Sequence, residues 1–326
     1  MDDSLASWLR LREPADAAAR SDRLTRMIAD ALAGPGEPRF LGRRPVRRSA
    51  LRGGGSRVSG EGGSRTLSEP LRVLDLGTGT GANLRYLVPR LPRLQHWLVA
   101  DRDPELLALL PGLTASWGAA REYDVRTHAR GCVVRGERLE CHVEARQLDL
   151  GSLTESGHTD LFAGRHLVTA SALLDLVSPR WLEELATRCR TAGAAALFTI
   201  TYNGQSCCSP SEPGDEVIRD LLNRHQNRDK GLGGPAAGPD AASWAVRCFT
   251  AAGYRVRTEP SDWSLGPADH ALQRRLIEGW AAAAIEMGLA AATVAGWCGR
   301  RIAHVDAGRS RIVVGHVDIA AVAPPP

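Results

Sequence analysis

The chain has 326 residues, of which 43% are hydrophobic, and a formal net charge of +4 at pH 7. No apolar run reaches the about 18 residues that a membrane span requires, and the first residues lack the basic-then-apolar pattern of a secretion signal. The seven cysteines show no C-x-x-C pair and no zinc-ligand spacing. We therefore expect one enlarged cytoplasmic domain with reduced thiols, and neither a membrane protein nor a disulfide-rich secreted protein.

Residues 1–34 are predicted to form a helical lid. A first helix over Leu5–Arg12 ends before Pro14, and a second helix over Ala15–Ala33 ends before Gly34 and Pro35. Three charged residues could face either a ligand or solvent: Arg12, Asp16 and Arg20.

Residues 35–70 are rich in Gly, Ser and Arg, lack apolar periodicity and are predicted to form a flexible loop. Between Arg39 and Arg65 this loop holds eight arginines and one acid, Glu61, so the remainder of the chain is net negative. The positive charge therefore does not indicate a basic face on the fold, and a nucleic-acid partner is not expected. Arginine-glycine segments that bind RNA have the same composition, however, so RNA binding by the loop stays open.

The stretch Val73–Gly81 predicts a buried strand followed by a glycine-rich turn. The strand contains an acid, Asp75, and three glycines follow it at alternating positions. An amphipathic helix comes next, with apolar residues at Leu84, Leu87, Val88 and Leu91. A strand, a glycine turn and a helix bring bare backbone against a nucleotide-like ligand, because a Cβ would prevent close approach.

The spacing D-x-G-x-G-x-G differs from the G-x-G-x-x-G of dinucleotide-binding dehydrogenases. It resembles motif I of the class I S-adenosylmethionine (SAM) dependent methyltransferases. The resemblance implies that SAM is the cofactor. The cofactor-binding candidates in this motif are Asp75, Gly77, Thr78, Gly79, Gly81 and Asn83.

A second strand over Trp97–Ala100 ends at Asp101 and Arg102, which are further cofactor-binding candidates. Asp103 precedes Pro104, a pattern typical of a helix N-cap followed by proline at the first helical position. Asp101 is then free to accept hydrogen bonds from both ribose hydroxyls. We expect Asp103 to be structural.

A third strand over Leu139–Leu148 leads to Asp149 and Leu150, which the resemblance implies contact the adenine ring. A fourth strand over Leu167–Ala170 leads to Ser171 and Asp175, in a region that resembles motif IV. Ala170 is a cofactor-binding candidate, and Ser171 is a substrate-binding candidate. Asp175 faces the methyl acceptor or lies on the surface. The Asn-Pro-Pro-Tyr signature of methyltransferases acting on DNA bases and on protein glutamine is absent.

Further strands are expected over Ala194–Thr201, Tyr254–Thr258 and Arg311–Val322. The predicted fold class is α/β, with a seven-stranded, mostly parallel, doubly wound sheet whose last strand is antiparallel. Residues 71–326 form the predicted SAM-binding domain, with an acceptor-site insertion at about residues 203–240.

The insertion supplies the remaining candidates. Tyr202, His225 and Asp229 are candidate general bases, and Asn203 and Gln226 are candidate substrate-binding residues. His225 and Gln226 lie at the end of a predicted helix that starts at Asp215. No metal site is expected, and the sequence does not indicate an oligomeric state.

We expect methyl transfer to a small-molecule N or O acceptor by in-line displacement. A neutral amine needs no strong base, whereas a hydroxyl usually needs a base or a metal. Two alternatives stay open: an RNA or protein methyltransferase that uses the arginine-rich loop, and a SAM-binding protein without catalysis.

Overall fold

The computed structural model describes residues 4–33, 69–92, 94–154 and 159–323. The predicted arginine-rich loop at residues 35–70 lies outside the described residues except for its last two positions.

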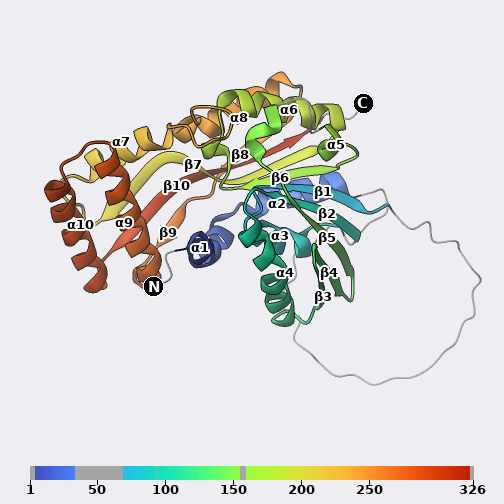
Figure 1. Cartoon of the computed structure of the whole chain (residues 1–326), viewed down its shortest axis with the longest axis horizontal. Helices are drawn as coiled ribbons and strands as arrows, with labels where there is room; N and C mark the ends of the chain where they lie inside the picture. The colour runs from blue at the N-terminus through green and yellow to red at the C-terminus, as the bar shows by residue number, and fades with distance from the viewer. Residues whose placement is uncertain (1–3, 34–68, 93, 155–158, 324–326) are drawn as a thin grey trace, which may run out of the picture.

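One sheet forms the centre of the molecule (Figure 1). Its strand order is β3-β4-β5-β2-β1-β6-β7-β10-β8, and β9 pairs with β10 beside this path. The five strands β5, β2, β1, β6 and β7 are parallel, and β10 is antiparallel to both of its neighbours β7 and β8. The strands are β1 (Leu71–Leu76), β2 (Leu94–Asp101), β3 (Asp124–His128), β4 (Gly131–Gly136), β5 (Leu139–Gln147), β6 (Leu167–Ser171), β7 (Ala195–Ser209), β8 (Arg255–Pro260), β9 (Trp263–Leu265) and β10 (Arg311–Val322).

The predicted doubly wound sheet with an antiparallel last strand is confirmed, but the predicted number of seven strands is wrong. The sheet has ten strands among the described residues, because the hairpin β3–β4 extends one edge and β9 adds a short strand at β10. The sequence Asp124–His128 of β3 is polar and largely exposed, so it lacks the apolar alternation that marks a half-buried strand.

Helices cover both faces of the sheet, as Figure 1 shows. The apolar cluster on one face joins the strands to α5 (Thr159–Phe162), α6 (Pro179–Ala192) and α8 (Ala241–Ala251). The cluster on the other face joins them to α2 (Asp22–Leu32), α3 (Ala82–Leu87) and α4 (Pro104–Ala119). The carboxyl ends of the parallel strands are thus left between two helical layers, where ligands bind in open α/β folds.

The strands β7 and β10 continue beyond the rest of the sheet and carry a third apolar cluster, which we call the cap. Its helices are α7 (Asp215–Gln226), α9 (His270–Glu286) and α10 (Ala291–Asp306), seen at the left in Figure 1. The prediction of a strand that ends at Thr201 is therefore wrong. Asn203 and Gly204 lie inside β7, where the antiparallel ladder to β10 runs as far as Ser209 opposite Arg311.

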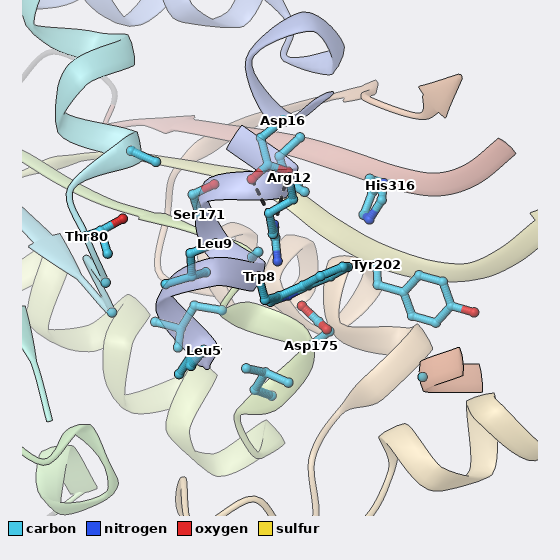
Figure 2. A pocket seen from close by; sticks show the side chains of 18 of the residues that line it. Leu5, Trp8, Leu9, Arg12, Asp16, Thr80, Ser171, Asp175, Tyr202 and His316 are labelled. Atoms are coloured by element: carbon cyan, nitrogen blue, oxygen red, sulfur yellow. Dashed lines mark hydrogen bonds and ion pairs between the residues drawn. The ribbon is translucent and has the colours of Figure 1, made fainter. Parts of the chain in front are cut away.

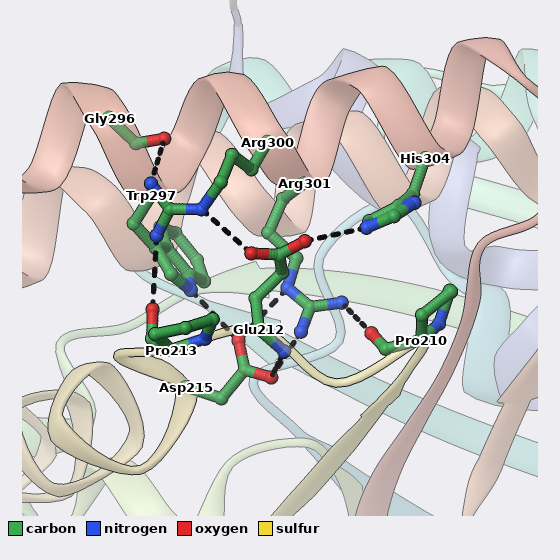
Figure 3. Close-up of polar contacts among 9 residues, drawn as sticks. All are labelled: Pro210, Glu212, Pro213, Asp215, Gly296, Trp297, Arg300, Arg301 and His304. Atoms are coloured by element: carbon green, nitrogen blue, oxygen red, sulfur yellow. Dashed lines mark hydrogen bonds and ion pairs between the residues drawn. The ribbon is translucent and has the colours of Figure 1, made fainter.

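A partly buried charge network joins α10 to the start of α7 and the segment before it (Figure 3). Arg301 is fully buried, forms a bidentate ion pair with Asp215 and donates a 2.6 Å hydrogen bond to the carbonyl of Pro210. Glu212 accepts a 2.7 Å hydrogen bond from Nε of Arg300, and Nε2 of His304 lies 2.7 Å from its other oxygen. These contacts hold the cap helices at a fixed position on β7.

The helix α1 (Leu5–Ala19) continues through Pro14, so the predicted helix end before this proline is wrong. Ser4 caps α1, and Ser21 caps α2 by accepting a 3.1 Å hydrogen bond from the N–H of Leu24. Helix α1 packs against both the cap and the carboxyl ends of the parallel strands. The N-terminal segment thereby lines part of a cavity at the carboxyl ends of the parallel strands, which is described below.

Candidate active site

The turn after β1 requires glycine at three positions. Gly77, Gly79 and Gly81 have φ angles of +64°, +53° and +85°, which side chains rarely adopt. A Cβ on Gly81 would also lie 2.9 Å from Cγ of Leu110, and a Cβ on Gly79 would lie 3.0 Å from Cδ1 of Leu9. The alternating glycines therefore reflect both backbone conformation and the close approach of α4 and α1.

Asp75 stabilises this turn through hydrogen bonds to its side chains. It is fully buried, and its two oxygens accept a 2.6 Å hydrogen bond from the hydroxyl of Thr78 and a 2.5 Å hydrogen bond from the amide of Asn83. Burial raises the pKa of Asp75 to about 6. Buried Arg20 donates to Asn83 at 2.9 Å and to Ser171 at 2.7 Å, so it ties the turn to the end of β6.

Asp101 lies at the carboxyl end of β2, beside the glycine turn. Its carboxylate accepts a 2.7 Å hydrogen bond from the N–H of Gly79 and a 3.0 Å hydrogen bond from the N–H of Asp103. Each carboxylate oxygen can accept a further hydrogen bond, so Asp101 retains capacity for a ligand. Asp103 caps α4 by accepting from the N–H groups of Glu105 and Leu106, which confirms its predicted structural role.

A cavity of about 1070 Å³ extends from the glycine turn to the cap (Figure 2). The turn, Asp101 and Leu150 line one end. Residues of α1, β7, β9, β10 and α9 line the other. Ligand pockets typically measure roughly 300–1,000 Å³, so this cavity has room for a nucleoside-sized molecule and a second small molecule.

The structure brings most of the sequence-predicted candidates to this cavity. Those that line it are Gly77, Thr78, Gly79, Asn83, Asp101, Arg102, Leu150, Ser171, Asp175, Tyr202 and Gln226. Those that do not line it are Asp75, Gly81, Asp149, Ala170, Asn203, His225 and Asp229.

The candidates outside the cavity have other contacts. Asp149 borders a separate, shallower pocket beside Arg102. His225 lies 3.2 Å from the carboxylate of Glu286 at the end of α9. Asp229 accepts a 2.7 Å hydrogen bond from the N–H of Gly231, and Asn203 accepts a 3.0 Å hydrogen bond from the N–H of Gln205.

The cap end of the cavity, which we call the acceptor end, contains aromatic residues that the sequence analysis did not identify. Trp8 of α1 and Trp263 of β9 pack edge to face, with ring centroids 6.5 Å apart. The ring of His316 on β10 lies 5.0 Å from Trp263 and 6.2 Å from Tyr202. Tyr202 donates its hydroxyl to Asn223 at 2.8 Å. No local pattern marks Trp8, Trp263 and His316, because three distant segments contribute them, whereas Tyr202 was already a candidate.

Two ionisable groups at the acceptor end are neutral near pH 7. Burial lowers the pKa of His316 to about 3, and the nearby guanidinium of Arg12 contributes to this shift. Burial raises the pKa of Tyr202 well above its ordinary value of 10. Neither side chain is therefore charged at neutral pH, and neither is a strong general base.

Two residues that line the cavity have backbone conformations that are costly for their side chains. Ile200 of β7 has a φ of +56°, and Ala172 after β6 has a φ of +52°. A β-branched residue in this region is an outlier, and such strain concentrates at functional sites. Asp318 stabilises Ile200 by accepting a 2.8 Å hydrogen bond from its N–H group.

Within the described parts of the chain, no group of three or more His, Cys, Asp or Glu side chains is placed to bind a metal ion. None of the helices described here has the length and apolar character needed to span a bilayer.

No protein-family model matches the sequence, and no curated protein matches it significantly. Solved structures with a similar arrangement include a Bacillus halodurans protein provisionally described as a methyltransferase, with 13% identity, a TM-score of 0.42 and coverage of 78% of this chain and 93% of that chain. The cyclopropane synthase MmaA2 from Mycobacterium tuberculosis has 12% identity, a TM-score of 0.39 and coverage of 78% and 79%. A geranyl diphosphate methyltransferase in complex with SAM has 10% identity, a TM-score of 0.36 and coverage of 78% and 79%.

At these TM-scores the likeness carries no argument about cofactor or acceptor. The fold class rests on the chain's own features. A parallel core β5-β2-β1-β6-β7 is followed by an antiparallel last strand between β7 and β8, and a three-glycine turn follows β1. This is the α/β fold class predicted from the sequence, with a mostly parallel, doubly wound sheet and an antiparallel last strand.

Proposed function

We propose that the protein is a cytoplasmic SAM-dependent methyltransferase that acts on a small-molecule N or O acceptor. One observation carries this proposal. A single cavity joins the glycine turn and Asp101 to an acceptor end with aromatic walls. A cofactor bound at the turn would share this cavity with its acceptor.

The residues at the turn fit SAM chemically. The backbone of Gly77–Gly79 offers a floor that a Cβ would fill, and Asn83 lies beside it. Asp101 would accept the ribose hydroxyls through its remaining lone pairs. Leu150 would pack on the adenine ring, and Asp149 is a candidate for the adenine amino group from the adjacent pocket.

When bound, SAM would supply an activated methyl group on a positively charged sulfur. The protein would contribute alignment of the acceptor and exclusion of water. Helix α1 serves both purposes in this proposal, because Leu9 lies against the turn and Trp8 against the acceptor end. Residues 1–34 would thus act as the lid of a catalytic domain over residues 71–326.

The first experiment is calorimetry with SAM, S-adenosylhomocysteine and NAD. Binding of SAM or S-adenosylhomocysteine in the micromolar range, about −8 kcal/mol, would support the proposal. Binding of NAD without binding of SAM would refute it. Labelled SAM with a fractionated metabolite extract would then identify the acceptor, and failure to form S-adenosylhomocysteine with any fraction would favour a non-catalytic SAM-binding protein.

The size of the cavity favours a small acceptor over RNA or protein, because about 1070 Å³ has room for a nucleoside-sized molecule and a second small molecule. The arginine-rich loop provides the test, because eight arginines that contact phosphates would make RNA binding strongly salt-dependent. We expect deletion of residues 39–65 to leave SAM affinity nearly unchanged. Salt-dependent RNA binding that disappears on deletion would overturn the small-molecule acceptor without affecting the SAM site.

A further inference from the structure

Asp175 is a buried carboxylate at the acceptor end that lacks a full set of partners. It lies in the turn after β6, has a relative exposure of 7% and lines the cavity. Oδ1 has no hydrogen-bond partner among the described residues, and the backbone N–H groups of Asp175 itself and of Tyr202 offset only part of the pKa rise that burial causes. An unsatisfied buried carboxylate oxygen is costly, so it needs an explanation beyond folding.

The surrounding charges do not neutralise Asp175 directly. Arg12 binds Asp16 through two hydrogen bonds of 2.9 and 3.2 Å, and Trp263 donates to the same carboxylate at 3.1 Å. Arg12 and Lys230 act on Asp175 only through space. The Arg12–Asp16 pair is neutral overall, so the nearby cations offset only part of the cost of burying the Asp175 carboxylate.

Aromatic rings border the same space. In Figure 2, Asp175, Trp8 and Tyr202 approach it from the β6 turn, α1 and β7. Trp263 of β9 lines the same space, so four elements of the fold contribute to it. A cation near aromatic faces is attracted by the ring quadrupoles, and this attraction is stronger in a desolvated site. The guanidinium of Arg12 already lies over the ring of Trp263, 5.3 Å from its centroid, so the rings of Trp8 and Tyr202 are the ones left for an organic cation beside Asp175.

The ionisable groups at this end also favour one acceptor chemistry. A hydroxyl acceptor usually needs a base, whereas a neutral amine does not. His316 has a pKa lowered to about 3, and Tyr202 uses its hydroxyl as a donor to Asn223. Neither is suited to removing a proton from a hydroxyl group. Asp175 is the remaining base at this end, and a carboxylate with a pKa of about 6 accepts a proton far more readily from an ammonium ion than from a hydroxyl group.

We propose that the acceptor is an amine, bound as an ammonium ion by Asp175 with its apolar body against Trp8, Trp263 and Tyr202. This inference rests on the proposed function, and it makes the protein an N-methyltransferase.

The chemical step then balances. The bound ammonium gives one proton to the carboxylate of Asp175, whose pKa is raised to about 6 by burial. The nitrogen lone pair forms the new N–C bond as the C–S bond breaks and its electron pair stays on sulfur. The products are S-adenosylhomocysteine and a methylated ammonium ion, and Asp175 returns its proton to water when they leave.

The test is calorimetry with three probes of similar size in the presence of S-adenosylhomocysteine: phenethylamine, phenethyl alcohol and phenylacetate. We expect phenethylamine to bind at least tenfold more tightly than either of the other probes. The Asp175→Asn variant should lose at least tenfold in phenethylamine affinity and change little toward the alcohol. Asp220→Asn, on the exposed surface of α7, is the matched control and should behave as the wild type.

Two results would overturn the amine proposal. One is equal affinity for the amine and the alcohol, including no detectable binding of either. The other is an unchanged amine affinity in a folded Asp175→Asn variant. Binding of S-adenosylhomocysteine alone is measured first. If it binds and amine selectivity is absent, the amine proposal fails while the methyltransferase proposal stands. If it does not bind, the methyltransferase proposal itself fails.

Discussion

Replacement of Asp175 by asparagine should stabilise the protein at neutral pH. Burial raises the pKa of this carboxyl group from its ordinary value of 3.8 to about 6. The folded protein therefore holds the proton more tightly than the unfolded chain does. The free energy of unfolding of the wild type falls as pH rises from about 4 to about 6, and the loss remains complete above that range.

The size of the effect follows from the shift. A difference of about two pKa units corresponds to about 3 kcal/mol, at about 1.36 kcal/mol per unit. Asparagine has nearly the same shape and keeps an oxygen for the N–H of Tyr202, but it carries no charge. Asp75 has a similar raised pKa in both proteins, so its contribution cancels in the difference between them.

The assay is urea unfolding of both proteins at about pH 4 and about pH 8. The free energy of unfolding of Asp175→Asn minus that of the wild type should rise by about 2.4 kcal/mol between these two pH values, because the unfolded chain is already partly ionised at about pH 4. A difference that stays constant, or that falls with pH, would refute the reasoning that Asp175 is ionised at a cost. If Asp175→Asn has a higher free energy of unfolding at neutral pH and also binds the amine less tightly, the wild-type carboxylate lowers stability in exchange for ligand binding.

The remaining predictions concern other parts of the molecule. Asp101→Asn should weaken S-adenosylhomocysteine binding at least tenfold in calorimetry, because Asp101 would bind the ribose by charge-assisted hydrogen bonds of roughly 1.5–3 kcal/mol each. Asp103→Ala should leave that affinity within about twofold but lower the free energy of unfolding by about 1 kcal/mol through the lost helix cap; an exchange of these two phenotypes would contradict the assigned roles. Arg301→Met should lower the free energy of unfolding in urea by about 3–5 kcal/mol, because Asp215 loses its buried partner. Arg301→Met combined with Asp215→Asn should recover part of that loss. A single variant as stable as the wild type would count against the role of this network.

Local patterns were sufficient to predict the cofactor half of the cavity. Parallel strands all end at one edge of a sheet, so a polar residue after each apolar run is brought to the same place. Asp101 at the end of β2 was predicted in this way, and the structure places it at the cavity. For Asp175 after β6 the sequence left open whether it faces the acceptor or lies on the surface, and the structure places it at the cavity. The three glycines were predictable because their conformation and their close contacts are properties of the turn itself.

The acceptor half could not be predicted in the same way, because long-range pairing builds it. Asn203 and Gly204 are typical turn residues, yet the ladder with β10 keeps them in a strand. His225 and Asp229 were chosen from a polar cluster, but the packing of α7 against α9 places His225 beside Glu286. Trp263 reaches the cavity only because β9 pairs with β10.

The extension of β7 and β10 has a consequence for changing specificity by protein engineering. Three acceptor-end side chains, those of Tyr202, Val314 and His316, project from paired strands rather than from loops. Substitutions at these positions would leave the backbone ladder intact, since that ladder depends on main-chain groups. Because all three side chains are buried, a combinatorial library at these positions should retain folded members when it is restricted to side chains of similar volume. Such a library would vary the shape of the acceptor end while the cofactor half stays constant.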